Sequence, residues 1–137
     1  MDEAASRQEV APGARGLGPA KDQDDLAVFD PAWIDALRSG LSPELVRNLL
    51  SSCLGSMEQY LAELRRCAVA GTLEDARRAA HDLKGICAQF GALQASAVAR
   101  RIETETAGVA ALREALPALE TCLGGAVAEI RRIAQAV

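Results

Sequence analysis

The feature that most constrains the fold of this chain is the recurrence of apolar residues at intervals of three and four. It is clearest in residues 73–91, where the apolar stripe consists of Leu73, Ala76, Ala80, Leu83, Cys87 and Phe90. This spacing marks one face of an amphipathic α-helix, whereas a half-buried strand would show alternation. Similar stripes recur in residues 46–67, 95–102 and 109–134. The sequence therefore predicts an all-α protein.

Capping and breaking residues divide the chain into separate helices. Asp30-Pro31 and Ser42-Pro43 each place proline after a capping residue, and Thr72 can cap the helix that follows it. Gly91 and Gly108 end the next two helices. We expect a short lid helix over about 31–38 and four long helices in an antiparallel up-down-up-down four-helix bundle. Pro117 should kink the last helix or mark a late start, and Gly124-Gly125 should weaken it.

Composition limits the class of protein. Residues 1–25 are rich in Ala, Gly, Pro, Asp and Arg, which predicts a disordered N-terminal tail before a domain at 28–136. The net charge of −4 argues against nucleic-acid binding. No apolar run reaches the ~18 residues of a membrane span, so we expect a soluble, cytoplasmic protein without membrane contact. The four cysteines are widely spaced, which favours buried thiols over disulfides or zinc.

The only histidine, His81, lies off the apolar stripe of residues 73–91 and should face solvent or a shallow groove. Lys84 follows one turn later. Gly85 lies in the middle of the predicted helix, where glycine costs about 1 kcal/mol relative to alanine. Because helical side chains lean toward the N-terminus, a side chain at Gly85 would lie over the turn that carries His81. These three residues could therefore accommodate a bulky anion.

A carboxylate is expected beside this histidine. If the chain turns near Ala92, His81 precedes the turn by 11 residues and Glu103 follows it by 11, so both should lie at the same height. Glu103 could accept a hydrogen bond from one imidazole nitrogen and leave the other as a nucleophile. Arg77 and Arg78, one turn before the histidine, could add positive charge.

Plainer interpretations remain open at this point. An isolated histidine on a helix is usually a solvated polar residue, and Lys84, Arg77 and Arg78 could form an ordinary charged surface. Glu103 could equally be a surface carboxylate. One histidine next to Asp82 does not make a metal-ligand set, because adjacent helical residues do not converge.

Three segments together resemble histidine-containing phosphotransfer (HPt) domains: His81-Asp82-Leu83-Lys84-Gly85, Phe90-Gly91-Ala92 and Ile102-Glu103. The resemblance covers about residues 28–136. It implies a monomeric bundle in which His81 accepts a phosphoryl group from the aspartate of one receiver domain and passes it to another. Lys84 would offset phosphoryl charge, Gly85 would provide clearance, and Glu103 would orient the imidazole.

The same resemblance implies the partners, which are receiver domains of a hybrid histidine kinase and of a response regulator. We find no carboxylate cluster suited to Mg²⁺ in the sequence, so the chain should need no cofactor and the metal should belong to the receiver. Docking should use Asp82, Ile86 and Ala88 with parts of the first two helices. Ile86 stands where family members often have small or polar residues, which leaves partner choice open.

Two other functions compete with phosphotransfer. Histidine-kinase dimerisation helices can also carry His-Asp/Glu-Leu, but here Lys84-Gly85 follows and no glycine-rich phosphate loop is present. We therefore expect a phosphoryl carrier without ATP-dependent kinase activity. The remaining alternative is a helical binding module that sequesters a signalling partner while His81 stays unphosphorylated.

Overall fold

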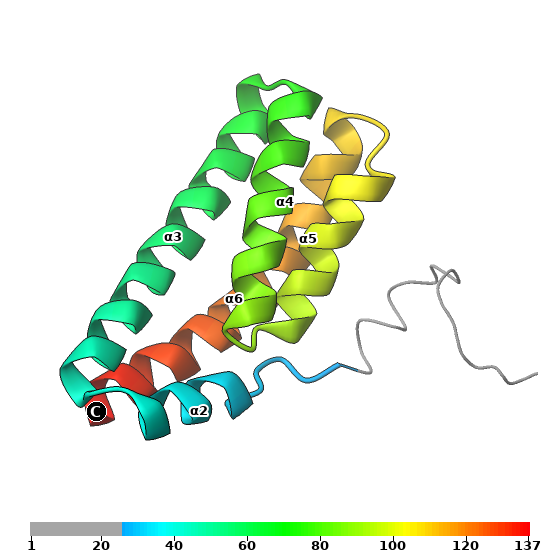
Figure 1. The fold of residues 1–137 in the computed structure, drawn as a ribbon. Coiled ribbons are helices and arrows are strands. Elements are labelled where there is room, and N and C mark those ends of the chain that lie inside the picture. Colours follow the sequence, from blue (N-terminus) through cyan, green and yellow to red (C-terminus); the bar gives the residue numbers. More distant parts are fainter. Residues whose placement is uncertain (1–25) are drawn as a thin grey trace, which may run out of the picture.

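The computed structural model describes residues 26–137, and within them the regular secondary structure is entirely helical (Figure 1). The helices of this part of the chain are α2 (Ala32–Gly40), α3 (Pro43–Ala70), α4 (Leu73–Gln89), α5 (Leu93–Glu105) and α6 (Val109–Ala136). The predicted all-α class is confirmed. The predicted tail, residues 1–25, lies outside the described residues. No helix in the described range is both long and apolar enough to cross a bilayer.

The two predicted helix caps that precede α3 and α4 are formed. Ser42 Oγ accepts a hydrogen bond from the Leu45 amide at 3.2 Å, and Pro43 occupies the first position of α3. Thr72 Oγ1 accepts from the Asp75 amide at 3.2 Å. Each cap satisfies a backbone donor that the first helical turn leaves without a partner. The start of each of these two helices is therefore fixed by residues next to it in the sequence.

The four long helices enclose one core. α4 packs against both α3 and α5, and α6 packs against both α3 and α5. The apolar stripes face inward, as periodicity predicted. The largest fully buried side chains come from every helix in the described range, and among them are Ile34, Leu50, Leu64, Leu83, Ile102, Leu119 and Ile130.

α2 lies across the end of the bundle where α4 turns into α5 (Figure 1). The Asp30 amide donates to the Gly91 carbonyl at 2.8 Å. Gly91 has φ of +87°, and an added Cβ would lie 1.9 Å from the Asp30 carbonyl oxygen, so only glycine fits. The segment before α2 also contacts α6, because a Cβ on Gly125 would lie 2.9 Å from Val28 Cγ1. Gly125 in the last helix thus makes room for the segment that leads into α2, whereas a Cβ on Gly124 would meet nothing within 4 Å.

Two sequence expectations need adjustment. α2 extends to Gly40, beyond the predicted end at residue 38. α6 begins at Val109 and continues through Pro117 to Ala136, so the alternative of a late start at the proline is wrong.

None of the four cysteines, all in the described range, forms a disulfide, and all are buried. Burial raises the pKa of Cys53 and Cys87 to about 12, which keeps both as thiols at neutral pH.

Candidate functional site

His81 projects from the middle of α4 with 60% of its side chain exposed. Its Nδ1 atom lies 2.7 Å from Glu103 Oε2, although the two residues are 22 positions apart. The predicted exposure of the histidine and its pairing with Glu103 are therefore confirmed. Within the described chain, no hydrogen bond involves the other ring nitrogen of His81, Nε2.

Glu103 is shared between two side chains on α4. Its second oxygen, Oε1, accepts a hydrogen bond from Lys84 Nζ at 2.8 Å. The side chains of Glu103 and Lys84 are 23% and 30% exposed, so this pair is more sheltered than the imidazole. Lys84 lies one turn after His81 on α4, so both side chains reach the same carboxylate, which belongs to α5.

The protonation states follow from these contacts. The hydrogen bond from Lys84 lowers the pKa of Glu103 most, the one from His81 lowers it further, and partial burial opposes both. Glu103 is consequently ionised at neutral pH and can only accept hydrogen bonds. In a neutral imidazole the proton must then sit on Nδ1, which leaves the lone pair on Nε2. The arrangement is that of an oriented nitrogen nucleophile.

Gly85 borders open space. A Cβ built on it would meet no atom within 4 Å outside the backbone of its own helix. Neither the core nor the imidazole therefore excludes an alanine at this position. The glycine leaves the surface of α4 beside His81 without a side chain. Only a residue larger than alanine at this position could obstruct a molecule that approaches His81 from solvent.

The two arginines predicted to support the histidine have other partners. Arg77 donates to the Thr106 carbonyl at 2.8 Å, at the end of α5. Arg78 lies 3.8 Å from Glu74 and 3.7 Å from Asp75 on its own helix. Lys84 is thus the cation that the structure brings into the cluster of His81 and Glu103.

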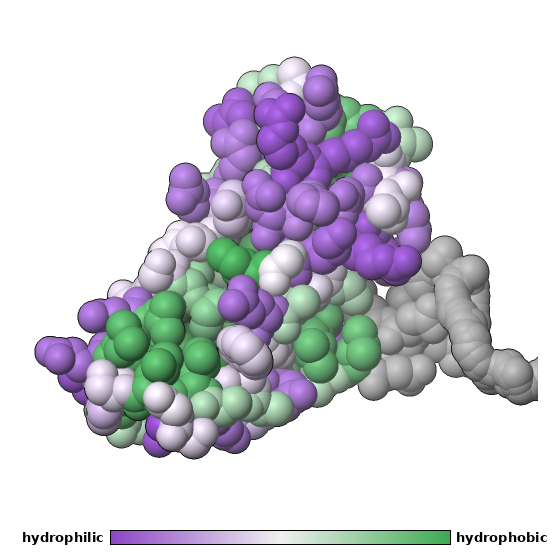
Figure 2. Space-filling model, in the orientation of Figure 1, coloured by the Kyte–Doolittle hydropathy of each residue, from purple (hydrophilic) through white to green (hydrophobic). Residues whose placement is uncertain are grey.

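The residues predicted to contact a partner lie on α4 within two helical turns after the histidine. Asp82 and Ala88 are exposed, and Ile86 is half-buried against the core. Asp82 lines a groove of about 210 Å³ between α3 and α4, together with Gln59, Tyr60, Glu63, Asp75, Arg78 and Ala79. Figure 2 shows polar side chains over much of α4 and α5 and an apolar area over α2 and the start of α3. Trp33, Leu45 and Leu49 are the large exposed apolar residues of α2 and of the first two turns of α3.

Sequence reasoning missed one polar contact beside this cluster. Ser96 Oγ on α5 donates to the Lys84 carbonyl at 3.0 Å. Ser96 precedes Glu103 by two helical turns, so it projects from the same face of α5 toward α4. That spacing was readable from the sequence, but a side-chain bond to a backbone carbonyl depends on how closely the helices approach.

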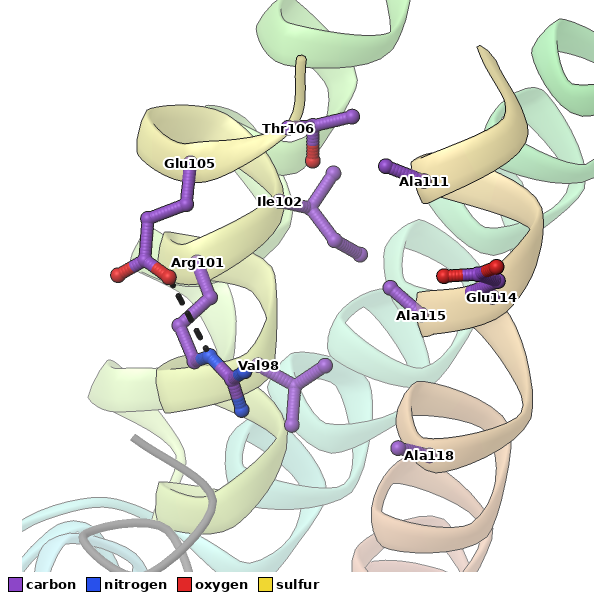
Figure 3. Close-up of a pocket in the computed structure, with 9 residues that line it drawn as sticks. All are labelled: Val98, Arg101, Ile102, Glu105, Thr106, Ala111, Glu114, Ala115 and Ala118. Carbon is purple, nitrogen blue, oxygen red and sulfur yellow. Dashed lines mark ion pairs between the residues drawn. The ribbon is translucent and has the colours of Figure 1, made fainter. Parts of the chain in front are cut away.

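A second hollow, of about 260 Å³, lies between α5 and α6 (Figure 3). Val98, Ile102, Ala111, Ala115 and Ala118 form its apolar wall, and Arg101 lies 3.7 Å from Glu105 at its rim. None of its lining residues belongs to the histidine cluster. Within the described residues, no group of three or more His, Cys, Asp or Glu side chains is placed to hold a metal ion.

Comparison with known proteins gives one match. The family model described as Hpt domain matches residues 48–132. The matched range contains His81, Lys84, Ser96 and Glu103. No curated protein and no solved structure matched the chain.

Proposed function

Because the chain belongs to the Hpt domain family, we propose that His81 is its phosphoryl-accepting residue and that Nε2 is the atom that forms the bond. Hpt domains exchange phosphoryl groups with receiver domains in phosphorelay signalling. The observation that carries the assignment to His81 is its Nδ1 contact with Glu103 at 2.7 Å, in a side chain that is 60% exposed and whose Nε2 forms no hydrogen bond in the described chain. An ionised acceptor on one nitrogen makes the other nitrogen the nucleophile.

The transfer is an exchange of one bond for another. The Nε2 lone pair attacks the phosphorus of a receiver aspartyl phosphate, and the bond between phosphorus and the aspartate oxygen breaks. The aspartate leaves as a carboxylate, and the imidazole, which keeps its proton on Nδ1, becomes a cation. The negative charge of Glu103 stabilises that cation. Attack by the aspartate of a second receiver reverses these steps.

Lys84 and Gly85 have distinct proposed roles. Lys84 Nζ has three donors, of which one binds Glu103 at 2.8 Å, so it can also offset charge on a phosphoryl group. Gly85 leaves the flank of α4 bare for the incoming receiver. Arg77 and Arg78, held by other groups, contribute at most a longer-range positive potential.

Docking is proposed on the surface around His81, with Asp82, Ile86 and Ala88 of the same helix as contact residues. The apolar area over α2 and the start of α3 would extend that surface (Figure 2). A carrier must release each partner after transfer, so we expect an interface at the lower end of the usual range, about 1,200 Å² in total. The partners would be the receiver of a hybrid histidine kinase and that of a response regulator.

The remaining parts of the proposal concern what the chain provides itself. Residues 28–136 would act as a monomer with antiparallel up-down-up-down helices, which the short α3–α4 and α4–α5 connections support. Mg²⁺ would be bound by the receiver. The chain would carry phosphoryl groups without transferring them from ATP.

The test is transfer from a phosphorylated receiver. The unaltered protein should acquire an acid-labile label, and His81→Gln should acquire none. Gln94→Ala offers a control that leaves the sole histidine in place. Label on His81→Gln, or no label on the unaltered protein with any receiver, would contradict the proposal. The second result, combined with stable binding to a receiver, would support the sequestering module instead.

A further inference from the structure

Ser96 connects α5 to the α4 segment that carries the histidine cluster. Its hydroxyl donates to the Lys84 carbonyl at 3.0 Å, in a partly buried contact. The side chain of the same lysine reaches Glu103 at 2.8 Å. Lys84 is therefore attached to α5 at two points, through its carbonyl to Ser96 and through its ammonium to Glu103.

The attachment lies at an intrinsically weak point of α4. Gly85 follows immediately, and glycine within a helix has more backbone freedom than any other residue. It also has no side chain to pack, and the space that a Cβ would occupy is empty. A hydrogen bond from a neighbouring helix therefore restrains the backbone where packing at residue 85 does not.

We propose that Ser96 is a positioning residue for phosphotransfer. It fixes the height of α4 against α5, so that His81 and Lys84 reach the two separate oxygens of Glu103. A shift of the Lys84 backbone would displace His81, which lies one turn earlier on the same helix. The consequence for transfer rests on the proposed function, whereas the effect on the imidazole can be measured without any receiver.

A matched set of variants isolates the hydroxyl of Ser96. Ser96→Ala removes it, and Ser96→Thr retains it. Thr104→Ala removes a hydroxyl of the same helix that donates to the Arg100 carbonyl at 2.9 Å and does not reach α4. Nitrogen-15 spectra of the imidazole would report its tautomer and its titration in each variant. Transfer from a phosphorylated receiver would be timed in parallel.

In the unaltered protein we expect one tautomer, with the proton on Nδ1. Ser96→Ala should populate both tautomers and slow transfer about three- to tenfold, the equivalent of one hydrogen bond. Ser96→Thr should restore both measurements, and Thr104→Ala should match the unaltered protein.

Three results would overturn the inference. They are an unchanged tautomer in Ser96→Ala, a Ser96→Thr variant as impaired as Ser96→Ala, and an equal effect of Thr104→Ala. If no receiver phosphorylates the unaltered protein, the proposed function fails, and the imidazole spectra still decide the role of Ser96.

Discussion

Glu103 Oε2 lies 2.7 Å from His81 Nδ1 across the interface between α5 and α4. This contact fixes which nitrogen of the imidazole can react, because the carboxylate only accepts hydrogen bonds. The same carboxylate binds Lys84 through its other oxygen. One acidic residue on the neighbouring helix thus holds both the imidazole and the lysine ammonium.

Replacing Glu103 with glutamine should slow transfer. Gln keeps an oxygen that can accept from Nδ1 but has no charge to stabilise the imidazolium. Hydrogen bonds to charged groups are worth about 1.5–3 kcal/mol, so we expect a loss of about ten- to a hundredfold in the transfer rate. Glu105→Gln is the control, since Glu105 lies on the same helix and pairs with Arg101. Equal rates for both variants would contradict this role of Glu103.

Stability should depend on pH through Glu103. Its pKa in the folded protein lies below the ordinary value, because of Lys84 first and His81 second. A lowered folded pKa contributes stability that is present above the unfolded pKa and is lost as pH falls through the folded pKa. Urea unfolding of the unaltered protein and of Glu103→Gln should therefore differ most at neutral pH, and the curves should converge in acid. A difference that grows as pH falls would refute the assignment.

Gly85 should be limiting for partner access rather than for folding. Gly85→Ala should raise the free energy of unfolding by about 0.5–1 kcal/mol, because the added Cβ enters open space and the helix gains propensity. Gly85→Leu should also fold but should slow loading from a receiver more than the alanine variant does. Thermal unfolding and transfer kinetics would separate the two effects. Equal loading by both variants would show that clearance at this position is irrelevant.

Gly91 should tolerate no side chain. Its φ of +87° and the 1.9 Å approach of a Cβ to the Asp30 carbonyl predict a loss of about 1–3 kcal/mol for Gly91→Ala. Gly124→Ala is the matched control, because its Cβ would meet nothing within 4 Å. That variant should be more stable than the unaltered protein. Urea unfolding with both variants equally stable would mean that the contact between α2 and the α4–α5 turn is dispensable.

Periodicity and counting from the α4–α5 turn sufficed to predict the helices and the pairing of His81 with Glu103. Both depend on helix geometry, which repeats regularly along a chain. The hydrogen-bond partner of Arg77 could not be predicted in this way. A long side chain one turn from His81 can point along the helix in several directions, and here it binds the Thr106 carbonyl.

Contacts between segments distant in sequence also escaped prediction. Gly125 reads as a weak point in a helix, but in the structure it gives room to Val28 from the segment before α2. The close approach of Asp30 to Gly91, sixty-one positions later, likewise could not be predicted, although the glycine itself marks the end of α4. Such features depend on where separate elements meet, and a single sequence does not encode that meeting in any local pattern.

Glu103 binds His81 with one oxygen and Lys84 with the other, and this has a consequence for the protein once it carries a phosphoryl group. If Lys84 turns toward a newly attached phosphoryl group, the carboxylate loses one neighbour while the imidazole beside it gains positive charge. The two changes offset each other within a few ångströms, and no helix has to move. Donor and recipient receivers would then meet the same shape, so the direction of flow would be decided by their own phosphate affinities rather than by a switch in this bundle.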